Sequence, residues 1–78
     1  KQEFVVIELK LSQSSDAVVG QILRYIGWVK DRLTTKNQSV RGIIVCQSVS
    51  EKLLYAISEV PFISILEYDL SLTLTPVS

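Results

Sequence analysis

Two pairs of residues in this sequence have the types and the spacing of a chemically active site. Glu8 and Lys10 are two residues apart in the apolar run VVIELKL, and Gln21 and Tyr25 are four residues apart in GQILRYIGWV. A carboxylate can hold a hard metal ion, and an ammonium can stabilise developing negative charge. An amide and a phenol can each donate and accept hydrogen bonds. The first pair could therefore belong to a metal-and-phosphate site, and the second pair would add polar groups if the fold brings it close.

The run around the first pair predicts a β-strand over residues 3–11, because Val5, Val6 and Ile7 are β-branched and apolar on both alternating faces. Such a strand is expected in the middle of a sheet covered on both sides. Alternation places Glu8 and Lys10 on one face of the strand, next to each other and partly shielded from water. Two interpretations follow from this segment: a structural ion pair at the sheet edge, or a metal-and-phosphate site.

The second pair lies on a predicted helix over residues 16–33, capped by Ser14 or Ser15. Its apolar stripe should pack on the sheet and consists of Val19, Ile22 or Leu23, Ile26, Val29 and Leu33. Gly20 and Gly27 cost helix stability, and we expect close backbone contacts there in compensation.

Gln21 and Tyr25 share a flank of this helix with Trp28 and Arg32, beside the apolar stripe. A helix that packs back on its own strand brings Gln21 and Tyr25 toward the strand end that carries the first pair. Ligand sites in open α/β sheets gather at the carboxyl ends of strands. The alternative is that these are packing groups with a polar tip at the surface.

The remaining elements predict an α/β fold in the order β-α-β-α-β-β. Residues 40–46 form a second core strand, parallel to the first, and residues 50–59 form a shorter helix capped by Ser48 or Ser50. Residues 62–68 form a third strand, and residues 71–77 alternate as an edge strand does.

The composition excludes several classes of function. One Cys cannot form an internal disulfide, and one Cys without any His is too few ligands for a zinc site. The 78 residues make one domain at most, with no net charge to attract nucleic acid over the whole surface. No apolar run approaches the roughly 20 residues of a membrane span, so we expect no membrane and a cytoplasmic location.

The motifs resemble a known superfamily of nucleases. The segments IELK and GQILRY look like the E-x-K and Q-x-x-x-Y motifs of the RecB-like branch of the PD-(D/E)xK nucleases. The stretches VIELK, GQILRYIGWV and VRGIIV are similar to the nuclease domain of the NucS-type mismatch endonucleases. The resemblance is close over residues 4–46 and looser from Ser50 onward. It implies a restriction-endonuclease-like mixed sheet, incomplete at the N-terminus, with residues 1–78 as the C-terminal part of one nuclease-like domain.

The resemblance also implies roles for the residues of both pairs. Glu8 and the backbone carbonyl of Leu9 would be ligands of Mg²⁺ or Mn²⁺, and Lys10 would orient the attacking water or stabilise the transition state. Gln21 and Tyr25 would contact the DNA backbone or hold the catalytic groups. The implied function is that of a metal-dependent DNA endonuclease.

One feature departs from the family pattern, which requires an Asp on a strand before E-x-K. Glu3 cannot replace it, because it points to the opposite face from Glu8. We therefore expect these 78 residues to hold part of a nuclease site and not to cut DNA alone. The alternative is a catalytically inactive nuclease-like module that binds DNA or a partner protein. The unpaired edge of the first strand, or the absent N-terminal segment, predicts a homo-oligomer.

Overall fold

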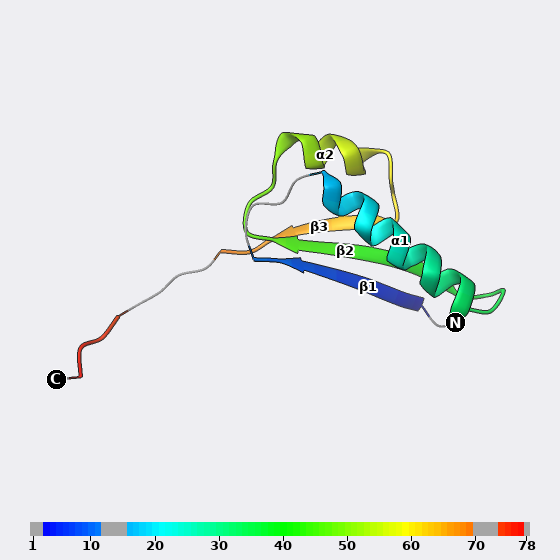
Figure 1. Cartoon of the computed structure of the whole chain (residues 1–78), viewed down its shortest axis with the longest axis horizontal. Helices are drawn as coiled ribbons and strands as arrows, with labels where there is room; N and C mark the ends of the chain where they lie inside the picture. The colour runs from blue at the N-terminus through cyan, green and yellow to red at the C-terminus, as the bar shows by residue number, and fades with distance from the viewer. Residues whose placement is uncertain (1–2, 12–15, 70–73, 78) are drawn as a thin grey trace.

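The computed structural model describes residues 3–11, 16–69 and 74–77. They form five elements: β1 (Glu3–Lys10), α1 (Ala17–Arg32), β2 (Ser39–Cys46), α2 (Glu51–Ser58) and β3 (Ile63–Glu67) (Figure 1). The α/β class and the order of these five elements are confirmed, each within one residue of its predicted bounds at either end.

The three strands form one parallel sheet in the order β1-β2-β3. β2 is thus the central strand, and the prediction that β1 is central is wrong for the described residues. The sheet is parallel throughout these residues, whereas the prediction was a mixed sheet. Residues 74–77 have no regular structure, so the predicted sixth element does not appear there, and residues 71–73 lie outside the described ranges.

Both helices cover the same face of the sheet (Figure 1). Two right-handed crossovers that step in one direction across a parallel sheet put their helices on one side. The even-numbered residues of β2 therefore face the helices and are buried, whereas its odd-numbered residues are partly buried or, at Ser39, exposed. The core is completed by residues from both helices and β3: Val18, Val19, Ile22, Ile26, Leu53 and Ile63.

The opposite face of the sheet has no cover among the described residues. Ile7 and Leu9 on β1 are 64% and 56% exposed, and Leu66 on β3 is exposed on the same face, on the far side of β2. For the described residues, the prediction of a strand covered on both sides is therefore wrong. The apolar run of β1 has two apolar faces, but only the face with Phe4 and Val6 packs against the core.

Close packing between helix and sheet occurs at Gly42 on β2. A Cβ there would lie 2.8 Å from Cδ1 of Ile22 and 3.0 Å from Cδ1 of Ile26. Gly20 and Gly27, where we expected close contacts, have open space around them on the outer side of α1. The glycine that admits the close approach is therefore on the strand, not on the helix.

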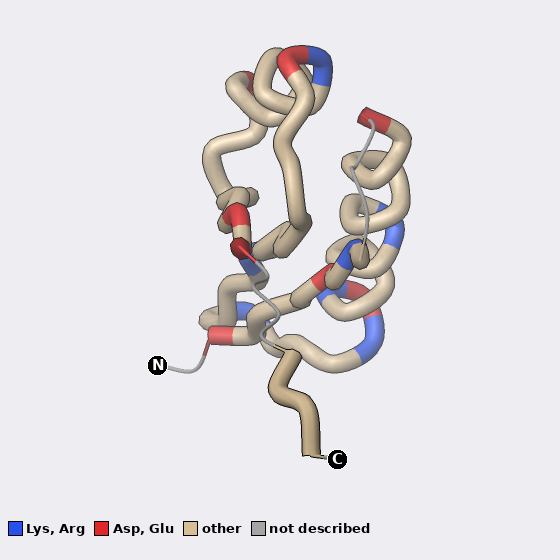
Figure 2. Tube along the Cα trace, turned by 90° about the vertical axis from the view of Figure 1, so that its left-hand side faces the viewer, with Lys and Arg blue, Asp and Glu red and all other residues tan. Residues whose placement is uncertain are grey.

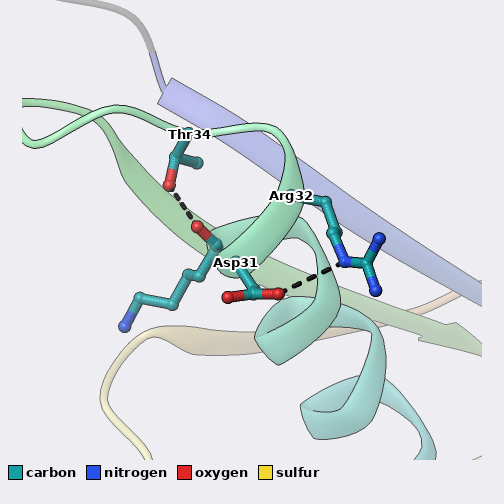
Figure 3. A network of polar contacts seen from close by, with 4 residues as sticks. Asp31, Arg32 and Thr34 are labelled. Carbon is teal, nitrogen blue, oxygen red and sulfur yellow. Dashed lines mark hydrogen bonds and ion pairs between the residues drawn. The ribbon is translucent and has the colours of Figure 1, made fainter.

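The helix ends are fixed by short-range hydrogen bonds. Ser50 caps α2, where its Oγ accepts from the Leu53 N–H at 3.1 Å, as predicted. Ser14 and Ser15, the predicted caps of α1, lie outside the described residues. At the other end of α1, Thr34 Oγ1 donates to the Lys30 carbonyl at 2.6 Å, and Arg32 pairs with Asp31 at 3.3 Å (Figure 3).

Candidate site at the carboxyl end of the sheet

Glu8 and Lys10 are neighbours on the helix-covered face at the carboxyl end of β1. Their closest atoms, Lys10 Nζ and Glu8 Oε2, are 3.6 Å apart, and the two side chains are 34% and 20% exposed respectively. The predicted adjacency and partial shielding are confirmed. The distance is that of an ion pair without a direct hydrogen bond. Both groups thus remain open to a further ligand.

The backbone carbonyl of Leu9 points to the free edge of β1. Gly42 N–H donates to the Phe62 carbonyl, and the Cys46 carbonyl accepts from Tyr68 N–H, so even-numbered residues of β2 bond toward β3. Its odd-numbered residues then bond toward β1. With residue 8 of β1 opposite residue 44 of β2, the odd-numbered residues of β1 direct their N–H and C=O groups away from the sheet. The Leu9 oxygen is therefore an accessible hard donor next to Glu8.

Gln21 and Tyr25 lie on the flank of α1 that faces the β1 side. Residues on a helix advance by 100°, so this flank lies to one side of the buried line of Val18, Ile22 and Ile26. In a right-handed crossover that side lies over β1. Gln21 is half-buried and Tyr25 is exposed. Among the described residues, neither side chain forms a hydrogen bond or ion pair with Glu8 or Lys10.

The same flank of α1 continues into exposed aromatic and basic residues. Trp28 is 56% exposed, and the helix carries Arg24, Lys30 and Arg32 against a single acid, Asp31. Figure 2 shows basic positions recurring along this helix. The helix therefore offers positive charge and a flat aromatic surface on its outer side.

The site also includes three residues that were not predicted from the sequence. They lie at the carboxyl ends of β2 and β3 and are Cys46, Glu67 and Tyr68. Cys46 pairs in register with Lys10 on one side and with Glu67 on the other. Lys10, Cys46 and Glu67 therefore form one row on the helix-covered face. Glu67 Oε2 accepts from Val49 N–H at 3.0 Å. Tyr68 donates its hydroxyl hydrogen to the Lys10 carbonyl at 3.3 Å. This row of residues can be recognised only when the register between the three parallel strands is known.

Cys46 is not a nucleophile in this arrangement. Its burial raises the pKa of the thiol above the ordinary value of 9.0, and the negative charge of Glu67 raises it further. The thiolate is the reactive form, so a thiol with a raised pKa is protonated and unreactive at neutral pH. Cys46 therefore serves as a small buried apolar group.

The site contains oxygen donors for a hard cation, but too few for a complete set of ligands. The Glu8 carboxylate and the Leu9 carbonyl are the ligand types that Mg²⁺ prefers, yet Mg²⁺ requires six ligands in near-octahedral geometry. The described part of the chain contains no group of three or more His, Cys, Asp or Glu able to hold a metal ion. Glu8 and Leu9 thus fit one side of a metal site, with the rest to come from water, substrate or other residues.

Comparisons with known proteins give no relative. No family model, curated protein or solved structure matches this chain. Within the described residues, no helix combines the length and apolarity needed to cross a bilayer.

Proposed function

We propose that this chain carries part of the active site of a metal-dependent DNA endonuclease. The observation that carries the proposal is the arrangement at the end of β1. The partly shielded Glu8 carboxylate lies 3.6 Å from the Lys10 ammonium. The backbone carbonyl of Leu9, which lies between these two residues in the sequence, points to the free edge of β1. The resemblance of IELK and GQILRY to nuclease motifs gives this arrangement its chemical interpretation.

Each residue has a defined task in this proposal. Glu8 and the Leu9 carbonyl hold Mg²⁺ or Mn²⁺, which would supply charge relief on the phosphate and an activated water. The Lys10 ammonium lies close enough to stabilise negative charge at the same point. Gln21 and Tyr25, on the covering helix, contact the DNA backbone or hold the catalytic groups.

The cleavage test compares variants of the two charged residues. The chain is assayed alone and within any longer gene product that includes it, on supercoiled plasmid with Mg²⁺ or Mn²⁺. We expect the longer product to cut, and Glu8→Gln and Lys10→Met each to lower the rate at least about 100-fold, as expected when transition-state stabilisation is removed. The 78 residues alone should not cut, because the described residues supply an incomplete set of metal ligands.

The matched control is Glu3→Gln. Glu3 is also an acid on β1, but it pairs with Arg41 at 2.9 Å on the uncovered face. Its variant should cut at the wild-type rate. Undiminished cutting by Glu8→Gln or Lys10→Met would remove the proposal, and so would an inactive longer product.

A second candidate function is a non-catalytic module that binds DNA or a partner protein. Within the described part of the chain, it is favoured by the incomplete set of metal ligands and by the uncovered apolar face of the sheet. Metal-independent DNA binding together with no cleavage by any form of the protein would decide for this candidate.

A further inference from the structure

Tyr68 connects the carboxyl ends of all three strands. It follows β3 directly, and its backbone N–H donates to the Cys46 carbonyl of β2 at 2.9 Å. Its hydroxyl donates to the Lys10 carbonyl of β1 at 3.3 Å, across 58 residues of sequence. The ring is half-buried. Among the described residues, no other side chain donates a hydrogen bond to the backbone of β1.

The hydrogen bond from Tyr68 acts where the sheet ends. The pairing of β1 with β2 stops at Lys10 and Cys46, and Leu11 is already exposed outside the strand. Strand ends fray when their last backbone groups lack partners. A hydroxyl on the Lys10 carbonyl fixes the orientation of the last peptide group of the strand. Successive carbonyls alternate in direction, so this also keeps the Leu9 carbonyl at the free edge.

We propose that Tyr68 is a positioning residue for the candidate site. Its hydroxyl holds the end of β1 so that the Leu9 carbonyl and the side chains of Glu8 and Lys10 keep their relative arrangement. The functional part of this inference rests on the proposed metal-dependent activity. Tyr68 touches neither metal nor DNA in this role, because its partner is a main-chain carbonyl.

The variant Tyr68→Phe removes only the hydroxyl group. The matched control is Tyr55→Phe, since Tyr55 is an exposed tyrosine on α2 whose ring hydroxyl makes no hydrogen bond within the described residues. Two properties are measured on the 78-residue chain by NMR: the carbonyl carbon shift of Lys10, and amide hydrogen exchange at residues 9–11. We expect Tyr68→Phe to change the Lys10 carbonyl shift and to speed exchange several-fold, and Tyr55→Phe to change neither.

Metal binding is measured on the same samples by titration with Mn²⁺, followed by paramagnetic broadening of the amide signals of residues 8–10. Tyr68→Phe should raise the Mn²⁺ concentration for half-maximal broadening about threefold or more. Where a longer product cuts DNA, the variant should raise the metal concentration for half-maximal cleavage by a similar factor. The rate at saturating metal should remain near that of the wild type.

The outcomes separate this inference from the proposed function. Unchanged exchange and carbonyl shift in Tyr68→Phe would overturn the positioning role, whatever the cleavage assay gives. Changed exchange with an unaltered Mn²⁺ titration would reduce Tyr68 to a structural residue and overturn the proposal. Failure of the wild-type chain to bind Mn²⁺ at residues 8–10 would instead overturn the metal site, while the exchange data still decide whether Tyr68 holds the strand end.

Discussion

At the residue scale, the chemistry of the carboxyl edge depends on which groups carry charge. Lys10, Cys46 and Glu67 follow one another across the three strands, with the buried thiol between a cation and an anion. A thiolate there would lose its hydration and meet the negative charge of Glu67. The neutral thiol is therefore the form that the folded state stabilises, and this coupling has a measurable pH dependence.

We predict that the stability of the chain falls at alkaline pH through Cys46. The folded-state pKa of this thiol lies above its ordinary value of 9.0. The folded chain then binds the thiol proton more tightly than the unfolded chain does. This stabilisation is complete below about pH 9 and is lost as the pH rises through the folded pKa. In urea unfolding between pH 7 and 10.5, the free energy of unfolding should decline with pH, and the decline should be smaller in Cys46→Ala. An equal dependence on pH in the two proteins would contradict the raised pKa of Cys46.

We predict opposite effects of two Gly→Ala substitutions. Gly20→Ala on the outer side of α1 meets open space and should raise the free energy of unfolding by about 1 kcal/mol. Gly42→Ala places a methyl group 2.8 Å from Ile22 and should lower the free energy of unfolding by about 1–3 kcal/mol. Urea midpoints at constant m-value measure both changes. The expected order of midpoints is Gly20→Ala, wild type, then Gly42→Ala, and a stabilising Gly42→Ala would show that the helix packs elsewhere.

At the element scale, α1 combines a buried face with an exposed flank that carries aromatic side chains. Tyr25 and Trp28 are exposed there, among the basic residues of the helix. Aromatic rings at a positively charged surface stack on unpaired bases, whereas a duplex keeps its base faces hidden.

We predict that a single-stranded oligonucleotide quenches the fluorescence of Trp28, which is the only tryptophan of the chain. The titration is done with oligo-dT in EDTA, so that it needs no metal and no cleavage. Quenching should be saturable, should weaken with salt, and should be smaller with a duplex of equal length. Arg24→Gln should lower the affinity several-fold, and Arg41→Gln, on the uncovered sheet face, should not. Fluorescence that stays constant at low salt would exclude this flank as a binding surface.

The elements themselves were predictable from local patterns. The helical spacing of Val19, Ile22 and Ile26 and the cap at Ser50 set α1 and α2, and β-branched runs set β1 and β2. The adjacency of Glu8 and Lys10 follows from strand alternation alone. These features depend only on residues that are close in sequence.

The features that were not predictable depend on residues far apart in sequence. The apolar run of β1 fits a central strand and an edge strand equally well. Its position at the edge of the described sheet, with β2 as its neighbour, could therefore not be inferred. The contact between Tyr68 and the Lys10 carbonyl spans 58 residues and has no local signature. The close approach at Gly42 needs the helix and the sheet to be packed together before it can be recognised.

At the scale of the whole molecule, the sheet offers two unsatisfied surfaces. The free edge of β1 presents backbone groups without partners among the described residues, and the uncovered face presents Ile7, Leu9 and Leu66. Unpaired edges and apolar patches both promote association between chains. We therefore predict that the chain self-associates, with a mass by sedimentation equilibrium that rises with concentration above the 8.8 kDa of one chain.

Two substitutions at Ile7 test whether copies of the chain associate through the free edge of β1 or through the uncovered face of the sheet. The N–H of this odd-numbered residue points to the free edge, so Ile7→Pro blocks edge pairing without removing a hydrogen bond between β1 and β2. Ile7→Lys leaves the edge intact and places a charge on the uncovered face. If copies pair through the edge, Ile7→Pro should sediment as a monomer and Ile7→Lys should still associate, because backbone hydrogen bonds carry the contact. If they pack through the face, both variants should be monomeric, and a wild-type chain that remains monomeric up to about 1 mM, where even weak contacts are populated, would exclude both modes.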